Sequence, residues 1–304
     1  MPTTLKDIAR ATGLSTTTVS LVLNGKPHRI SKEKCQLIKE TAKKMDYHPN
    51  RLAVGLIKHE TRTVGLILPD ITNVFFSEFA KGLEDVLWKH GYHLLLCNTN
   101  DCHEQEISAI RMMRNAMVDG LITVMSSETI GDKEHQTFVA LKHMKRPVVL
   151  IDCFNESGGF STISLDNFKA TYIAVKYLVS LGHRRIACIC GPLGLETNDN
   201  RLRGYTVALA DCGIPFEKSL IYQGDFHYQS GYDAIPVLLP QKPTAVLCLN
   251  DMMAYGAMNA LNDQGLRVPD DVSVMGFDDI FFSQITSVPL TVICQPAYGM
   301  GQKA

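Results

Sequence analysis

The stretch TLKDIARATGLSTTTVSLVLNG, residues 4–25, carries the signals of two short helices joined by a tight turn. Thr4 and Asp7 have the spacing of a capping box, which predicts the start of the first helix. Gly13 ends that helix, and Ser15 is a good N-cap for a second one that closes at the final glycine. The stretch therefore predicts a helix-turn-helix arrangement near the N-terminus.

A row of three threonines opens the second helix, although threonine is a poor helix former. Apolar residues follow at spacings of three and four, the pattern of one buried helix face. We expect Thr18 and Val19 to lean toward the core and Thr16 and Thr17 to point outward. A helix-turn-helix unit places this part of its second helix in the DNA major groove, where threonine offers a hydroxyl and a methyl to base edges.

A third helix is predicted from the Ser31 cap to about Met45, packed behind the first two. Its inward side is expected to contain Leu37, Ile38, Thr41, Ala42 and Met45. Residues 1–62 contain 12 Lys and Arg against 5 Asp and Glu, whereas the rest of the chain contains 18 against 26. A small basic head on an acidic body favours a polyanionic partner for the head.

The chain has 304 residues, which is enough for two or three domains. It contains no apolar run long enough for a membrane span and no signal-peptide pattern, so we expect a cytoplasmic protein without membrane contact. Its nine cysteines form no C-x-x-C pair, and most lie inside apolar runs. They predict reduced core cysteines, and we expect no metal and no cofactor.

Short apolar runs alternate with amphipathic helices from Thr63 onward. The runs are TVGLILPD, HLLLCNT, GLITVM, PVVLID, RIACICG, TAVLCLND and VSVMGFDD. Helices are predicted at about 75–90, 104–116, 168–181, 200–212, 229–239 and 252–264. The alternation predicts an α/β body of two doubly wound parallel sheets, whose ligands bind beyond the carboxyl ends of the strands.

Polar side chains follow several of these predicted strands. They are Asp70, Asp152, Asn250 with Asp251, and Asp278 with Asp279, and Arg201 lies near the start of a helix. Carboxylate, amide and guanidinium groups can form hydrogen bonds with hydroxyl groups on neighbouring carbon atoms of a ligand. Some of these side chains could instead cap the next helix, and Asp251 is the best candidate for that role.

The stretch of residues 4–25, followed by RISKEKCQLIKETAKKMDYHPNRLAVGL, closely resembles the head of the lactose/galactose repressor family of bacterial transcription regulators. The VSLVLNGK form is similar to a subset that includes the regulator of the maltose system. The resemblance implies a hinge helix at about residues 50–57, which orders on DNA with Leu56 wedged into the minor groove. It also implies a two-lobed body like a periplasmic sugar-binding protein.

By this resemblance, Thr16 and Thr17 read bases, and Leu21 stands where many members have an arginine. We therefore expect an operator that differs from those of the arginine-bearing members. The candidate DNA-binding residues are Thr4, Ser15, Thr16, Thr17, Ser20, Leu21, Asn24, Lys26, Arg29, Asn50, Arg51, Ala53 and Leu56. The candidate effector-binding residues are Asp70, Phe75, Phe76, Asp152, Arg201, Phe226, Asn250 and Asp278.

The expected domains are a helix-turn-helix head at 1–48, a hinge and linker at 49–61 and an effector-binding and dimerisation domain at 62–304. Its two lobes are expected at about 62–160 plus 291–304, and at 161–290. Family members usually continue further, so we expect an incomplete C-terminus, either of a fragment or of a naturally shortened protein.

These patterns predict a homodimeric repressor that binds a two-fold symmetric double-stranded DNA operator. Its effector is expected to be a sugar or sugar phosphate rather than a purine. The sequence leaves open whether this effector releases the protein from DNA or strengthens DNA binding. A sugar-binding transport protein would need a signal peptide and would not need the basic head. An enzyme is disfavoured because the sequence contains none of the common phosphate-binding, serine-hydrolase or zinc-protease motifs.

Overall fold

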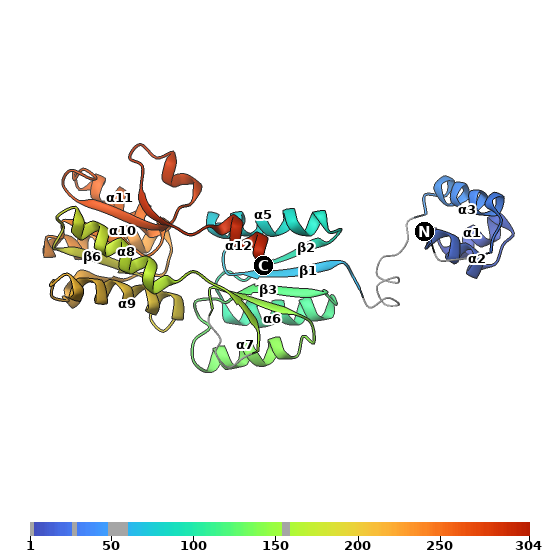
Figure 1. Cartoon of the computed structure of the whole chain (residues 1–304), viewed down its shortest axis with the longest axis horizontal. Coiled ribbons are helices and arrows are strands. Elements are labelled where there is room, and N and C mark those ends of the chain that lie inside the picture. The colour runs from blue at the N-terminus through green and yellow to red at the C-terminus, as the bar shows by residue number, and fades with distance from the viewer. Residues whose placement is uncertain (1–2, 26–28, 48–59, 154–158) are drawn as a thin grey trace. The chain divides into compact units, whose positions relative to one another are not determined.

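The computed structural model describes residues 3–25, 29–47, 60–153 and 159–304 (Figure 1). The chain divides into two compact units, and the first ends at Thr61. No helix in the described ranges combines the length and the apolar character that a membrane crossing needs. The predicted hinge helix falls outside these ranges.

The first unit is a bundle of three helices that form where the sequence predicts them. They are α1 (Leu5–Thr12), α2 (Thr16–Leu23) and α3 (Lys32–Lys44). Thr4 and Asp7 form the full capping box at α1, which ends at Gly13 with a left-handed φ of 66°. Ser15 caps α2 and Ser31 caps α3, each accepting a hydrogen bond from a backbone N–H three residues on.

The core of this unit contains Ile8, Val19 and Ile38, none of which is exposed. Leu37 was expected to face inward, and that prediction is wrong because its side chain is 46% exposed. Ile38 takes the inward position on α3, and successive residues of a helix point about 100° apart, so its neighbour turns toward solvent.

The first lobe of the second unit contains a five-stranded parallel sheet of order β2-β1-β3-β4-β5. Its strands are β1 (Thr63–Leu68), β2 (His93–Asn98), β3 (Gly120–Val124), β4 (Val148–Ile151) and β5 (Ser161–Ile163). Its helices are α5 (Val74–Lys89), α6 (His103–Asn115), α7 (Asp132–Lys142) and α12 (Ala297–Lys303). Of these elements, β5 and α7 are not among those that the sequence predicts.

The second lobe contains a five-stranded parallel sheet of order β10-β9-β8-β6-β7. Its strands are β6 (Ile186–Cys190), β7 (Ile221–Gln223), β8 (Ala245–Cys248), β9 (Ser273–Asp278) and β10 (Thr291–Cys294). Its helices are α8 (Asn167–Ser180), α9 (Glu196–Asp211), α10 (Tyr228–Leu238) and α11 (Asp251–Asp263). Short 3-10 turns are η1 (Lys218–Leu220), η2 (Leu239–Gln241) and η3 (Phe281–Gln284).

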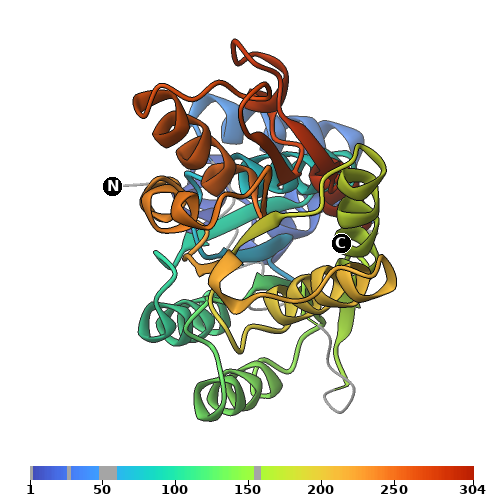
Figure 2. The same ribbon diagram turned by 90° about the vertical axis from the view of Figure 1, so that its left-hand side faces the viewer.

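Helices cover both faces of each sheet, which explains why the strands are apolar throughout. In the first lobe, Leu66 and Leu68 pack with α5 and α12, whereas Ile67 packs with α6 and α7 on the opposite face (Figure 1). In the second lobe, α8 pairs with α9 and α10 pairs with α11, and Figure 2 shows these two pairs on opposite sides of the sheet.

Glycine permits a close approach of α10 and α11. A Cβ built on Gly231 would lie 2.0 Å from the carbonyl oxygen of Met253, and one on Gly256 would lie 2.0 Å from that of Tyr228. No real Cβ tolerates such distances, so these two positions fix the spacing of the helix pair. The pair in turn positions the start of α11, which borders the cavity described below.

The chain crosses between the lobes at 164–166, after β5, and again at 295–296, after β10. The strand pairing therefore differs from the expected lobe bounds. β5 hydrogen-bonds to β4 and belongs to the first lobe, and β10 hydrogen-bonds to β9 and belongs to the second. The reason is that each crossing follows its strand, whereas the predicted bounds placed it before the strand.

Candidate functional site

The outward face of α2 is formed by Thr16 and Thr17, which are both exposed. Thr18 is half-buried, and its hydroxyl lies 2.8 Å from that of Ser15 in the N-cap. Val19 is fully buried. The three threonines therefore divide as the sequence predicts, with Thr18 serving the cap and the other two facing solvent.

The remaining DNA-binding candidates of the head differ in their hydrogen bonds and in their exposure to solvent. The Asn24 amide donates to the Ser20 carbonyl at 2.8 Å, and the Thr4 hydroxyl is engaged with Asp7 at 2.6 Å. Leu21 is half-buried. Arg29 is exposed, whereas the candidates outside the described residues are Lys26, Asn50, Arg51, Ala53 and Leu56. DNA contact by any of these residues stays a prediction.

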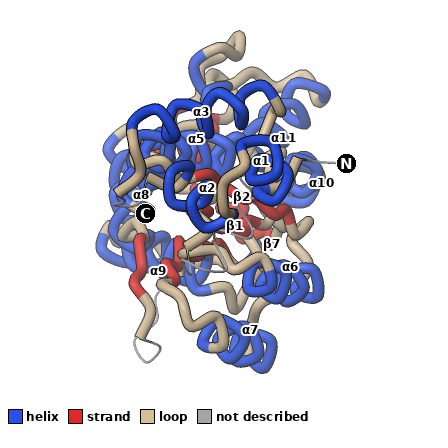
Figure 3. Tube along the Cα trace, turned by 90° about the vertical axis from the view of Figure 1, so that its right-hand side faces the viewer, coloured by secondary structure: helices blue, strands red, loops and turns tan. Residues whose placement is uncertain are grey.

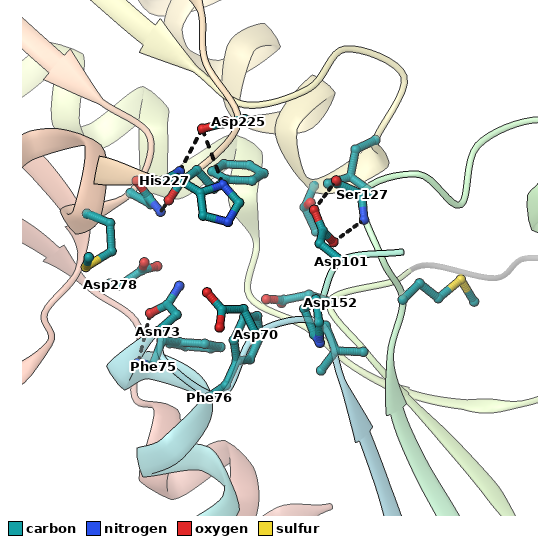
Figure 4. A pocket seen from close by; sticks show the side chains of 18 of the residues that line it. Asp70, Asn73, Phe75, Phe76, Asp101, Ser127, Asp152, Asp225, His227 and Asp278 are labelled. Carbon is teal, nitrogen blue, oxygen red and sulfur yellow. Dashed lines mark hydrogen bonds and ion pairs between the residues drawn. The ribbon is translucent and has the colours of Figure 1, made fainter. Parts of the chain in front are cut away.

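The second unit contains a cavity of about 710 Å³ beyond the carboxyl ends of strands from both sheets (Figure 4). This is the position at which open α/β sheets bind ligands. All eight predicted effector-binding residues line it, and they are Asp70, Phe75, Phe76, Asp152, Arg201, Phe226, Asn250 and Asp278. The cavity therefore brings together the residues expected at strand ends and those implied by the family resemblance, although their role in binding stays a prediction.

Arg201, near the start of α9, is the most heavily engaged side chain of the cavity. Its Nε donates to Asn167 at 2.7 Å, its Nη1 to the Leu249 carbonyl at 2.5 Å and its Nη2 to Gln295 at 3.1 Å. The guanidinium also stacks on the ring of Phe277, 3.8 Å from its centre. These contacts hold the fork rigidly in a buried position.

Asp152 and Asp278 face the cavity from opposite lobes, and Figure 4 shows them converging with Asp70. Burial raises the pKa of both carboxyl groups, to well above its usual range for Asp278, while the charge of Arg201 opposes the rise. The Oδ2 of Asp152 accepts from Gln295 at 2.9 Å. Its Oδ1 is buried and has no hydrogen-bond partner among the described residues.

Asn250 is the residue that caps α11. Its Oδ1 accepts from the Met253 N–H at 2.9 Å, and its Nδ2 donates to the Phe226 carbonyl at 2.7 Å. The prediction that Asp251 caps this helix is therefore wrong. The Asp251 carboxylate instead accepts from the Ile280 N–H at 2.9 Å, and burial raises its pKa to about 7.

Aromatic rings form the apolar part of the lining. Phe75 and Phe76 meet edge to face, with ring centres 5.3 Å apart. Phe75 is only 4% exposed and also belongs to the core of the first lobe. The ring of Phe226 lies where a Cβ on Gly191 would be, at 2.1 Å, so that glycine leaves room for it. Such walls suit the apolar face of a sugar or a base.

The sequence analysis missed a group of polar residues in the lining. They are Asn73, Asp101, Ser127, Asp225, His227 and Gln295. Asp101 accepts from the Ser127 N–H at 2.6 Å, and His227 lies 3.4 Å from Asp225 (Figure 4). Burial raises the pKa of Asp101, and the nearby His227 of the other lobe opposes the rise. Five of them lie shortly after the ends of β2, β3, β7 and β10, and Asn73 caps α5 after β1, so their position near strand ends was the signal.

Carboxylates dominate the charge of the lining. The acidic members are Asp70, Asp101, Glu134, Asp152, Glu196, Asp225 and Asp278. The basic members are Arg201 and His227. Across the described residues, no group of His, Cys, Asp and Glu has the arrangement of a metal site. The lining is thus suited to a ligand rich in hydrogen-bond donors.

Two family descriptions match the chain and together span nearly all of it. Residues 4–50 match the bacterial regulatory proteins of the lacI family. Residues 61–304 match the periplasmic binding proteins and sugar binding domain of the LacI family. The second match begins at residue 61, next to the boundary between the two compact units after Thr61.

Individual proteins show the same likeness over most of their length. The HTH-type transcriptional repressor PurR of Vibrio atlanticus is 35% identical over 303 residues, 99% of this chain and 89% of PurR. The lac repressor dimer bound to operator and the anti-inducer ONPF has a TM-score of 0.86 at 28% identity, covering 100% of this chain and 90% of its own. A LacI family regulator from Enterococcus faecium with bound ribose has a TM-score of 0.71 at 32% identity, with coverages of 79% and 86%.

Proposed function

Because the chain belongs to the LacI family of bacterial regulatory proteins, we propose that its cavity holds a neutral sugar whose binding controls operator affinity. The chain is a DNA-binding transcriptional repressor with an effector-binding domain, and it is not an enzyme. As in the lac repressor dimer on its operator, two copies of the head read a two-fold symmetric site. A repressor acts where the DNA is, in the cytoplasm.

The observation that carries the choice of ligand is the buried Oδ1 of Asp152, which has no hydrogen-bond partner among the described residues. A buried acceptor without a donor costs about 1–3 kcal/mol, so a ligand that supplies a donor gains that amount. Sugar hydroxyls supply such donors at neighbouring carbons. The ribose-bound relative supports this class of ligand.

The charge of the lining disfavours the sugar phosphate that the sequence had left open. A phosphate oxygen only accepts hydrogen bonds, and the carboxylates of the cavity repel its charge. Within the described part of the chain, Arg201 is the one guanidinium of the lining, and it is already hydrogen-bonded to Asn167, Leu249 and Gln295. A volume of about 710 Å³ lies within the range of small-molecule sites, about 300–1,000 Å³, and has room for more than one sugar ring.

Control follows from the position of the cavity. Its lining comes from both lobes, so a ligand that contacts both favours one arrangement of the lobes over the others. A ligand can shift the DNA-binding population only by its difference in affinity for the two states. Similarity to the maltose-system regulator, and a shortened C-terminus, both stay predictions.

The test is fluorescence anisotropy of the chain on labelled DNA from upstream of its own gene and of neighbouring genes. Each fragment is titrated alone and then with neutral mono- and disaccharides, with the 6-phosphates of the same sugars and with purines. We expect tight binding to one fragment, a shift of its affinity by one neutral sugar and an at least tenfold weaker effect of the matching phosphate.

Variants connect the response to the cavity. Arg201→Lys should keep operator binding and lose the response to the sugar, because lysine cannot replace the three directed N–H groups. Arg203→Lys, which exchanges an exposed arginine on the same helix, should keep both. A phosphate ester or a purine that acts more strongly than every neutral sugar contradicts the proposed ligand class. Equal binding to all fragments contradicts operator recognition.

A further inference from the structure

A second hollow lies in the first lobe, in the groove between α6 and α7. Its volume is about 300 Å³, and both helices run side by side on the face of the sheet opposite α5 (Figure 3). The floor is apolar and contains Ile107, Ile110, Val139 and Ala140. Val139 is 40% exposed, which is high for a valine beside a packed helix pair.

The rim of this groove contains two arginines and two histidines. Arg111 and Arg114 project from α6, and His135 and His143 face them from α7 and its C-cap. Among the residues that the structure describes, no acidic one belongs to the lining. Among the described residues, no hydrogen bond or ion pair is found for the side chains of the two arginines.

The spacing along α6 makes these arginines unusual for a merely solvated helix. Arg111 and Arg114 lie three residues apart, where like charges repel by a few tenths of a kcal/mol. Residues three and four away from either arginine include no aspartate or glutamate. The helix dipole explains Arg114, which lies in the last turn.

We propose that the groove between α6 and α7 is a docking surface for an acidic peptide segment of a partner protein. Carboxylates of the segment pair with Arg111 and Arg114, and an apolar side chain between them rests on Val139 and Ile110. The arginine fork matches a carboxylate in two parallel hydrogen bonds. The charge of the two arginines and the apolar floor together favour a short peptide that contains both acidic and apolar side chains.

A nucleic acid fits this groove less well. A nucleic acid carries a charge on every nucleotide, and the chain beyond residue 62 contains 18 Lys and Arg against 26 Asp and Glu, so its overall field opposes such a polyanion more than a short peptide with a few carboxylates. Asp132 and Glu134 in the first turn of α7 continue that repulsion at one end of the groove. The apolar floor also offers no partner to a phosphate.

The test uses selection from a phage-displayed library of random 12-residue peptides on the full-length chain. Phages that also bind the Arg111→Glu/Arg114→Glu variant are removed in each round. We expect the surviving peptides to be rich in Asp and Glu around an apolar residue. Labelled synthetic copies should bind the wild type at least tenfold more tightly than the variant.

Controls separate the groove from general charge and from folding. Lys176→Glu/Lys218→Glu reverses two exposed cations of the second lobe and should leave peptide affinity unchanged. Arg111→Gln/Arg114→Gln removes both charges, keeps polar side chains and should weaken peptide binding as the reversal does, while thermal unfolding and DNA binding stay as in the wild type. Protection from hydrogen exchange on peptide binding should map to α6 and α7.

Three results would overturn the proposal. One is a selection that yields no peptide able to distinguish the wild type from the glutamate variant. Another is a set of peptides without acidic residues. The third is displacement of a bound peptide by random-sequence double-stranded DNA in the Thr16→Ala/Thr17→Ala variant, which would assign the groove to a nucleic acid. None of these results depends on the sugar proposed for the cavity.

Discussion

Arg201 in the second lobe and Asp152 in the first are joined through a single side chain, that of Gln295. The Arg201 Nη2 donates to the Gln295 Oε1 at 3.1 Å, and the Gln295 Nε2 donates to the Asp152 Oδ2 at 2.9 Å. Gln295 stands in the crossing that follows β10, and Asn167, which accepts from Arg201, follows the other crossing. The Arg201 guanidinium is therefore hydrogen-bonded to a residue at each of the two segments that connect the lobes, Asn167 and Gln295.

Gln295→Met should lower the free energy of unfolding by about 1–3 kcal/mol, because it leaves a buried carboxylate oxygen and a buried N–H group without partners. Urea unfolding at pH 7 measures this loss. Gln229→Met removes an exposed hydrogen bond to Asp233 and should cost much less. Equal losses in the two variants would mean that the bridge adds nothing to the stability of the body.

Thr17→Ala should weaken operator binding by about 1–3 kcal/mol and leave binding to random-sequence DNA unchanged, because a base-edge contact carries sequence information and little else. Competition anisotropy with operator and random duplexes measures both affinities. Thr18→Ala is the matched control, since Thr18 bonds to the Ser15 cap and should affect the stability of the head. A uniform loss on all DNA after Thr17→Ala speaks against base reading.

Leu21→Arg should add a preference for guanine at one position in each half of the operator, worth about 1–3 kcal/mol, because arginine can form two hydrogen bonds to a guanine edge. Selection of bound sequences from a randomised duplex pool, for the wild type and the variant, measures the preference. Identical selected sequences would exclude residue 21 from base reading.

The stability of the body should fall as the pH rises from about 4 to 7, partly because of Asp251. Burial raises the pKa of this carboxyl group to about 7 from its ordinary value of 3.8. Over that interval the folded chain holds a proton that the unfolded chain has lost, so each step up in pH favours unfolding. The full shift corresponds to about 4 kcal/mol.

Asp251→Asn should therefore flatten this pH dependence, since an amide cannot ionise and can still accept from the Ile280 N–H. Urea unfolding at pH 5, 6, 7 and 8 measures the slope. Asp233→Asn, at an exposed position, is the control and should keep the wild-type slope. An unchanged slope in Asp251→Asn would assign the dependence to other groups such as Asp278.

Gly231→Ala should destabilise the body by about 1–3 kcal/mol or more, because the new methyl group would lie 2.0 Å from the Met253 carbonyl oxygen and would push α10 from α11. Gly299→Ala is the control, since its nearest neighbour is the Pro296 Cβ at 3.8 Å. Thermal unfolding compares the two. A Gly231→Ala protein as stable as the wild type would show that the helix pair can separate freely.

The sequence predicts most strands and most helices of the body because buried parallel strands are often continuous apolar runs with a clear length, whereas short strands such as β5 are not. It also predicts the cavity residues that directly follow those strands, such as Asp70 and Asp278. Gln295 escaped because a single glutamine at a crossing has no pattern of its own. Its role depends on Arg201, which is 94 residues away in the chain.

The misassignments have a similar cause. Asn250 and Asp251 are adjacent, and both are good capping residues, so composition does not decide between them. The backbone conformation decides which residue caps the helix, because Asn250 is extended while Asp251 is already helical. Leu37 and Ile38 present the same problem in the head, where one step along a helix separates the core from solvent.

The outward face of α2 is uncharged, with Thr16 and Thr17 exposed and Leu21 beside them. Ionic strength acts on protein–DNA affinity through the release of counterions by cationic side chains. The basic residues of the head therefore set how far binding weakens in salt, and they do so on every sequence alike. The ratio between operator and random DNA, which the uncharged face determines, should then remain constant as the salt concentration inside the cell changes.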